Sequence, residues 1–138
     1  MTLNHDRIRN KLQDIAKALD RLRRFGDMDK HAFMADEDSQ DIARSRLLTA
    51  IEAALNICYH ITSKDLQKIP EDYAECFHLL GDAGRIDPQL AERLAEMARF
   101  RNRLVHLYAE IDYGQVYDII QNDLGDLEIF SKQVTMSL

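Results

Sequence analysis

The chain of 138 residues has few of the residues that interrupt helices, with only two prolines and five glycines. Tryptophan is absent, and β-branched residues do not gather in alternating runs, so a protein of many short strands is not expected. No stretch approaches the ~18 consecutive apolar residues of a membrane span. The first ten residues also contain no apolar run of the kind found in a signal peptide. These absences predict a helical protein that is located in the cytoplasm and has no membrane partner.

Cysteine is also scarce, and the two that occur, Cys58 and Cys76, both lie in apolar helical patterns. Their number and spacing match neither a disulfide framework nor a zinc site, so we expect two reduced core residues. The histidines His5, His31 and His78 have no metal-binding neighbour of the right type three or four residues away. We therefore expect neither a metal ion nor another cofactor.

The charge of the chain is acidic overall, with a formal net charge of −6, which counts against generic nucleic-acid binding. The charge is unevenly distributed, however. Residues 85–106 contain five arginines and three acids, whereas residues 109–131 contain six acids and neither lysine nor arginine. A local basic site on an acidic body is therefore compatible with the sequence.

Apolar residues recur at helical spacing along most of the chain. In the first segment they follow one another in steps of 4, 3, 4 and 3 from Ile8 to Leu22, which marks one stripe of an amphipathic helix. Similar patterns predict five helices: residues 5–25, residues 41–62, a short helix that opens near Pro70, residues 87–108, and a last helix capped by Asp112 that includes Phe130.

The segments between these helices are short. Residues 26–40 are acidic with few apolar anchors and are expected to form a loop, and Gly81 and Gly84 are expected to mark a turn. Together these features predict an all-α fold, an antiparallel bundle of about five helices in a single domain, residues 1–138. The second and fourth expected helices are apolar on a wide face, so a homodimer is expected as well.

Residues 101–108, Arg-Asn-Arg-Leu-Val-His-Leu-Tyr, place a strong cation, an imidazole and a phenol close together. The planar guanidinium of Arg101 can bind a phosphate, and His106 can transfer a proton near neutral pH. These are the groups that phosphodiester cleavage needs when a 2′-hydroxyl is the nucleophile and no metal takes part. Asn102 could orient the imidazole or donate to a phosphate oxygen.

Helix geometry separates these residues. At about 100° per residue, Arg101 and His106 lie about 140° apart, whereas Asn102 shares a face with His106 and Tyr108 shares a face with Arg101. A straight helix thus presents two pairs and not one triad. A long arginine side chain, a distorted turn or a second subunit that contributes its own copy could bring the groups together, and we favour the last two.

The same residues also have a plain structural interpretation, in which Arg101 forms an ordinary salt bridge and His106 is a satisfied histidine between helices. Arg99 and Arg103 are four residues apart and repel each other unless an anion lies between them, so they are candidate ligand contacts. His60 lies near the end of its expected helix, and we favour a capping role for it over a contact with a cleft.

The order Arg, four residues, His, one residue, Tyr resembles the motif of the HEPN superfamily, on Arg101, His106 and Tyr108. The similarity extends to its HepT branch: residues 46–61 resemble that family's second long helix, and residues 73–80 resemble its next element. The resemblance covers most of residues 5–132 in order.

This resemblance implies an HEPN-like homodimer whose motif lines a cleft between the subunits. It implies a ribonuclease toxin and a partner antitoxin, the minimal nucleotidyltransferase MntA, which transfers AMP to the motif tyrosine, here Tyr108. Arg101, His106 and Asn102 would be catalytic, and Arg99 and Arg103 would contact the RNA substrate.

We therefore predict a metal-independent endoribonuclease that acts as the toxin of a toxin–antitoxin pair. Two alternatives remain. The first is a catalytically silent HEPN binding module that partners a nucleotidyltransferase, since members of the superfamily have lost catalysis. The second is a purely structural helical dimer, which would leave the polar motif unexplained.

Overall fold

A computed structural model describes residues 3–106 and 110–138 of the chain. Within these ranges it consists of seven helices and no strand: α1 (His5–Gly26), α2 (Lys30–Met34), α3 (Glu37–Lys64), α4 (Tyr73–Asp82), α5 (Pro88–His106), α6 (Tyr113–Asn122) and α7 (Leu124–Ser137). The predicted all-α fold is confirmed. The described residues form two helices more than the expected five, because the expected loop contains α2 and the expected last helix is divided into α6 and α7.

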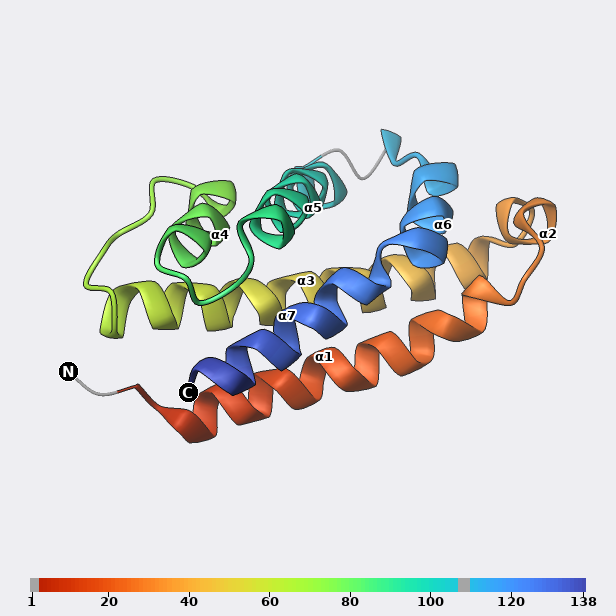
Figure 1. Ribbon diagram of the computed structural model, residues 1–138. Coiled ribbons are helices and arrows are strands. Elements are labelled where there is room, and N and C mark those ends of the chain that lie inside the picture. The colour runs from red at the N-terminus through yellow and green to blue at the C-terminus, as the bar shows by residue number, and fades with distance from the viewer. Residues whose placement is uncertain (1–2, 107–109) are drawn as a thin grey trace.

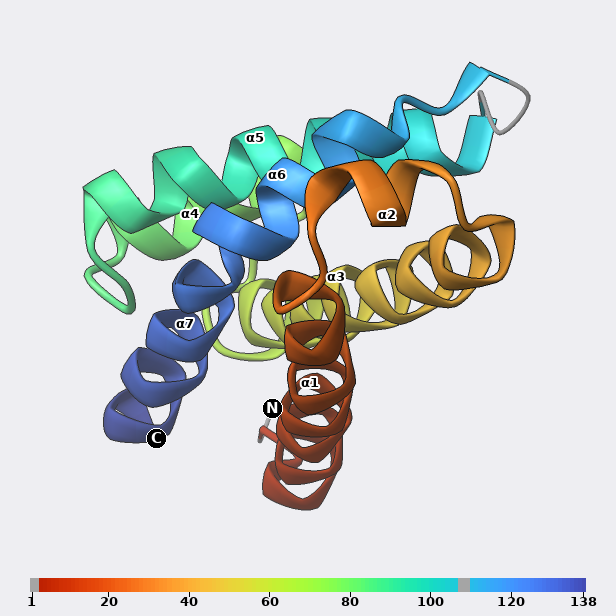
Figure 2. The same cartoon turned by 90° about the vertical axis from the view of Figure 1, so that its right-hand side faces the viewer.

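The long helix α3 is the centre of the molecule, and it packs against each of the other six helices. Figures 1 and 2 show α4 and α5 on one side of α3, and α1 and α7 on the other. The apolar stripe predicted for the first helix faces this centre, because Ile8, Ile15, Leu19 and Leu22 are all buried on α1. The core therefore forms where the amphipathic faces of α1, α3, α5 and α7 meet.

The expected loop at residues 26–40 is wrong in part, because it contains the short helix α2 and the first turn of α3. The Asp29 side chain caps α2 by accepting a hydrogen bond from the His31 N–H, and Asp36 caps α3 in the same way from the Asp38 N–H. Phe33 is fully buried and anchors α2 to the core. The acids that suggested a solvated loop therefore include two helix N-caps.

The expected last helix is divided at Asp123 into α6 and α7. Asp123 ends α6 and opens α7 at φ −116°, and the neighbouring Leu124 is buried. The apolar periodicity continues across this break, so the sequence pattern predicts one helix where the chain forms two. The break allows α6 to pack on α1 and α2 while α7 packs on α1, α3 and α5.

The third helix expected from the sequence is α4, and it begins later than expected, at Tyr73. The Asp72 side chain caps it by accepting a hydrogen bond from the Glu75 N–H, and Pro70 lies in the preceding loop. Gly81 does not belong to the turn but lies buried inside α4. A Cβ atom at Gly81 would lie 2.9 Å from the Ala91 Cβ of α5, so glycine permits the close approach of these helices. Gly84 alone supplies the turn, with φ +73°.

Both cysteines are buried and free, as predicted for core residues. Burial raises the pKa of the Cys58 thiol well above its ordinary value, and the neighbouring Cys76 adds to the shift. Among the helices of residues 3–106 and 110–138, none is long and apolar enough to cross a membrane.

Candidate functional site

The C-terminal half of α5 carries the motif predicted from the sequence. Leu90, Leu94, Phe100 and Leu104 are buried along one side of α5, which fixes the helix on the bundle and turns its polar residues outward. The helix is unbroken from Pro88 to His106. The predicted AMP acceptor Tyr108 lies outside the described residues.

Arg101 is held in place by three neighbours. Its Nη2 donates to Glu52 Oε1 on α3 at 2.9 Å, and its Nη1 donates to Asn102 Oδ1 at 3.3 Å. The guanidinium carbon lies 4.9 Å from the ring centre of Tyr73, which is a cation–π distance. The Arg101 side chain is only 15% exposed, so its orientation is fixed by packing as well as by charge.

One donor on this arginine has no acceptor. Arg101 Nε is buried and makes no hydrogen bond within the part of the chain that the structure describes. Buried polar atoms in proteins usually have partners. Arg101 therefore forms the salt bridge that a purely structural role would require, but this salt bridge leaves its Nε donor without an acceptor.

Arg101 lines the largest of the described pockets, a groove of about 610 Å³ that we call the α3 groove. Its other lining residues come from α1, α3, the loop after α3, and α4: Arg7, Glu52, Leu55, Asn56, Tyr59, His60, Ser63, Lys64, Lys68, Ile69, Pro70 and Tyr73. Four of these thirteen residues are lysines or arginines, and Glu52 is the one carboxylate. The groove is thus basic although the chain is acidic.

His106 lies at the last described turn of α5 and is exposed. It is not among the residues that line the α3 groove. Because α5 is helical from Arg101 to His106, a distorted turn between these two residues does not occur. The 140° separation expected from the sequence therefore persists within one chain.

The end of α5 is tied to α3 by Arg44, whose Nη2 donates to the Leu104 carbonyl oxygen at 3.0 Å. This hydrogen bond satisfies a carbonyl in the last turn of α5, next to His106. Arg44 was not predicted, since an arginine beside the apolar face of a helix reads as a surface residue. Its role depends on a contact 60 residues away in sequence.

Asn102 contacts Arg101 through its side-chain oxygen. It also lines a smaller pocket of about 260 Å³ between α4 and α5, together with His78 and Arg99. The structure therefore associates Asn102 with the arginine of the motif. The expected orientation of the His106 imidazole by Asn102 stays a prediction.

Arg99 and Arg103 do not face each other across an empty anion site. Arg99 forms an ion pair with Glu96 on the same helix, and the Arg103 guanidinium lies 5.4 Å from the ring centre of Phe100. Both side chains are exposed, and neither lines the α3 groove. Their repulsion is relieved locally, so it gives no independent reason to expect a ligand, and their contact with RNA stays a prediction.

The capping role favoured for His60 is wrong. His60 is 9% exposed and lines the α3 groove, where its Nε2 accepts a hydrogen bond from the backbone N–H of Asn4 at 2.9 Å. An acceptor nitrogen must be unprotonated. Burial lowers the pKa of His60, and the nearby cations Arg7 and Lys64 lower it further, so the neutral imidazole is favoured.

Sequence reasoning missed Glu52 and Tyr73, which position Arg101. A signal was present for Glu52, because Glu52 and Asn56 are polar residues four apart in the otherwise apolar stretch of residues 50–58. For Tyr73 the sequence indicated only that it belongs to the segment of residues 73–80. Within residues 3–106 and 110–138, no group of three or more His, Cys, Asp or Glu side chains is arranged to hold a metal ion.

Comparison with known proteins gives a consistent result. The family described as "Ribonuclease HepT-like" matches residues 15–134. The chain is 32% identical over 133 residues to a protein named tRNA nuclease HepT from Aphanizomenon flos-aquae, covering 95% of this chain and 89% of that one. It is 31% identical over 127 residues to a protein named mRNA nuclease HepT from Shewanella oneidensis, covering 91% of this chain and 94% of that one.

Solved structures agree with these sequence matches. A tri-AMPylated HEPN toxin of Shewanella oneidensis, in complex with an MNT antitoxin, superimposes with a TM-score of 0.86 at 29% identity and covers 95% of this chain and 98% of that one. A toxin–antitoxin structure with AMP-PNP gives a TM-score of 0.84 at 29% identity, covering 94% of this chain and 98% of that one. Sequence and fold therefore lead to one assignment: the chain belongs to the ribonuclease HepT-like family.

Proposed function

We propose that this protein is a metal-independent endoribonuclease, the toxin of a toxin–antitoxin pair that acts as a single domain in the cytoplasm. The observation that carries the proposal is the placement of Arg101. Its guanidinium forms part of the wall of a basic groove, fixed by Glu52 and Tyr73, and the same helix carries an exposed imidazole, His106, five residues later. The names of the HepT relatives support the same activity.

The chemistry follows from these two side chains. The 2′-hydroxyl oxygen of the RNA attacks the neighbouring phosphorus, the bond from phosphorus to the 5′-oxygen breaks, and a 2′,3′-cyclic phosphate forms. Arg101 stabilises the negative charge on the phosphorane oxygens. His106 takes part in the proton transfer, which removes the 2′-hydroxyl proton and delivers a proton to the leaving 5′-oxygen.

Glu52 pairs with Arg101 in the free protein, so an RNA phosphate that binds Arg101 must displace the Glu52 carboxylate. The carboxylate is about half exposed, so the pair is screened by solvent and its exchange for a phosphate costs little. Asn102 would keep the guanidinium oriented during that exchange, since its hydrogen bond to Nη1 does not depend on Glu52. Arg99 and Arg103, on the exposed side of α5, would contact RNA outside the groove.

We further propose that the active form is a homodimer. The wide apolar faces of α3 and α5 do not require one, because the other helices of the same chain bury them. The unbroken helix α5 keeps Arg101 and His106 apart, and Glu52 and Tyr73 hold Arg101 in place, so a second copy is needed to combine the two side chains. An Arg101→Ala chain mixed with a His106→Ala chain should then recover activity, because the mixed dimer contains one complete pair.

In this proposal, a nucleotidyltransferase antitoxin neutralises the toxin by transferring AMP from ATP to the Tyr108 hydroxyl, with release of pyrophosphate. The complexes of the HEPN toxin with its MNT antitoxin support this partner. The attached phosphate would occupy the place of the RNA phosphate at the motif.

The alternative is a catalytically silent module that only binds a nucleotidyltransferase. The Arg101–Glu52 ion pair favours it, because an arginine that is already neutralised can be purely structural. Cleavage of RNA in EDTA by the wild-type protein and by His106→Ala decides between the two. Loss of cleavage in a folded variant supports the enzyme, and equal behaviour of both proteins supports the silent module.

A further inference from the structure

The α3 groove continues well beyond Arg101. Its lining residues on α3 follow one another from Glu52 to Lys64 in steps of three and one, which places them in one stripe along the helix. Twelve residues at about 1.5 Å per residue give a floor about 18 Å long. At about 3.4 Å per stacked nucleotide, this length accommodates roughly five nucleotides of a stacked strand and fewer of an extended one.

Cations are spaced along this floor. Arg101 contacts Glu52 at one end, and the Arg7 Nε from α1 donates to Asn56 Oδ1 at 3.2 Å, one helical turn further on. Lys64 lies at the other end, and Lys68 lines the groove from the loop that follows α3. The one lining carboxylate already pairs with Arg101, so the rest of the groove has basic residues and no acid.

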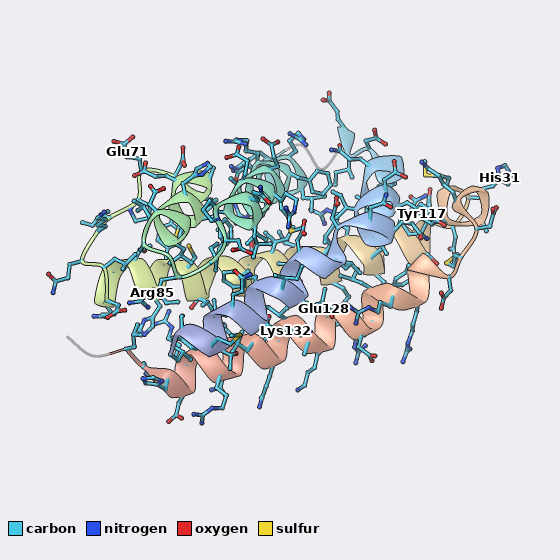
Figure 3. All side chains as sticks on the ribbon, viewed as in Figure 1. His31, Glu71, Arg85, Tyr117, Glu128 and Lys132 are labelled. Carbon is cyan, nitrogen blue, oxygen red and sulfur yellow. The ribbon has the colours of Figure 1, made fainter. Side chains whose placement is uncertain are left out.

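The loop that carries Lys68 is held by specific contacts. Gln67 adopts φ +55°, a left-handed conformation that is uncommon for a residue other than glycine, and the Lys68 N–H donates to the Thr62 carbonyl at 2.9 Å. Asp65 pairs with Arg85, which Figure 3 labels beside the end of α3. These contacts define the turn after α3 that places Lys68 among the residues lining the groove.

Two aromatic rings lie among these cations. Tyr59 and Tyr73 are half-buried and pack edge to face, with ring centres 5.7 Å apart. Burial raises the pKa of Tyr59 to about 12, so its phenol stays neutral and does not repel an anion. A basic track with interleaved aromatic rings is the arrangement that binds single-stranded nucleic acid, with phosphates on cations and bases on rings.

The charge state of His60 supports a positive field in the same place. Its pKa is lowered by burial first and then by Arg7 and Lys64, so these cations act on a group at the middle of the floor. Among the residues that line the groove, Glu52 is the one acid, and it lies on α3 like His60. A neutral His60, bonded to the Asn4 N–H, leaves the phosphate contacts to Arg7, Lys64 and Lys68.

We propose that the part of the α3 groove from Asn56 to Lys68 is an RNA subsite, which binds the single strand next to the phosphate that Arg101 holds. Arg7, Lys64 and Lys68 bind its phosphates, and Tyr59 stacks on a base. The proposal rests on the proposed ribonuclease function for its substrate class. The continuity of the groove with Arg101 and its tyrosines favour RNA over an acidic segment of an antitoxin.

The test measures binding and not cleavage. A short 2′-O-methylated oligouridylate labelled with fluorescein lacks the nucleophilic hydroxyl, so fluorescence anisotropy reports its affinity for the intact protein. The double variant Arg7→Ala, Lys68→Ala should weaken binding roughly tenfold or more at moderate salt. The slope of log affinity against log salt should fall by about 1.4, since each single-strand phosphate contact contributes about 0.7. Unchanged affinity and slope in a folded double variant would overturn the proposal.

The matched control is Lys132→Ala, which removes an exposed lysine of α7 that does not line the groove and is labelled in Figure 3. Its affinity and salt slope should equal those of the wild type. If the double variant binds the oligonucleotide normally but loses its complex with the antitoxin, the surface is a protein interface and the RNA subsite is wrong.

Cleavage assays separate this proposal from the proposed function. The double variant should raise the KM for RNA of several nucleotides more than it lowers kcat, because the subsite binds the strand and does not take part in the bond cleavage. A wild-type protein that binds the oligouridylate through Arg7 and Lys68 but cuts no RNA would retain the subsite and remove the ribonuclease activity.

Discussion

Glu52 and Arg101 form an ion pair between α3 and α5, with Glu52 Oε1 2.9 Å from Arg101 Nη2 across 49 residues of sequence. The arginine is largely buried and the glutamate is about half exposed, with side-chain exposures of 15% and 48%. The pair therefore fixes Arg101 at the groove while its partner stays in contact with water. A phosphate can replace the carboxylate without leaving a buried charge unpaired.

Glu52→Gln tests this relationship. The amide retains the shape of the side chain but removes the one carboxylate of the groove, so RNA binding should become tighter. The free energy of unfolding should change by less than about 1 kcal/mol, because the pair is screened. Anisotropy with the 2′-O-methylated probe and urea unfolding give the two quantities. Glu128→Gln, which removes the partner of Arg23 outside the groove, is the control and should leave affinity near the wild-type value.

Arg101→Lys should lose nearly as much cleavage as Arg101→Ala, at least about a hundredfold. Lysine has the charge but cannot stack its ammonium flat on Tyr73 or bond two acceptors with one planar group. Combination with His106→Ala should add little, because both groups act on one transition state. Rates that multiply in the double variant would indicate independent roles and contradict the mechanism.

Stability should depend on pH through His60. Its pKa is lowered in the folded protein, so the unfolded chain binds the proton more readily. The contribution of His60 to the free energy of unfolding is fully present above the pKa of histidine in the unfolded chain, near 6.5. It declines as the pH falls from there toward the lower pKa of His60 in the folded protein. Gln can still accept from the Asn4 N–H, so His60→Gln should reduce the loss in urea midpoint between pH 7.5 and pH 5.5. An equal loss in both proteins would assign the effect to other histidines.

Two glycine substitutions should lower the free energy of unfolding, and a third should raise it. Gly81→Ala should destabilise the fold by about 1–3 kcal/mol, because its Cβ would overlap the Ala91 Cβ in a buried contact. Gly84→Ala should cost about 1 kcal/mol through its positive φ, with open space around it. Gly125 lies in α7, and a Cβ there would meet no other atom, so Gly125→Ala should stabilise the fold by up to about 1 kcal/mol through its higher helix propensity. Thermal or urea unfolding gives all three values.

Modification should be specific to Tyr108. Tyr117 is an unsuitable acceptor, because it is 8% exposed and its hydroxyl donates to the Met28 carbonyl; Figure 3 shows it between α6 and α2. After incubation with the antitoxin and ATP, peptide mapping should find the adenylate on Tyr108. Tyr108→Phe should remain active in the presence of the antitoxin. An adenylate found only on Tyr113 would assign the control to another residue.

The parts of the fold that the sequence predicted are those set by local patterns. The stripe from Ile8 to Leu22 and the helical pattern of residues 87–108 specify helices through neighbours a few residues away, and α1 and α5 begin where expected. The break at Asp123 and the helix around Phe33 depend on packing against distant helices. Local periodicity does not contain that information.

The candidate site shows the same limit. The residues of the motif were visible because they are close in sequence, and so was the 140° angle between Arg101 and His106. The environment of Arg101 was not visible, because Glu52 and Tyr73 come from other helices and many polar residues could have faced it. His60 was assigned wrongly because its partner, the Asn4 N–H, lies 56 residues away.

The most direct test of the central claim is cleavage of an RNA whose 2′-hydroxyl is replaced by hydrogen at the cut position, in EDTA. The wild-type protein should cut the normal RNA to a 2′,3′-cyclic phosphate and a 5′-hydroxyl, and should leave the substituted RNA intact. His106→Ala should leave both intact while unfolding at the wild-type midpoint. Cutting of the substituted RNA, or cutting that stops in EDTA, would contradict a metal-independent ribonuclease built on Arg101 and His106.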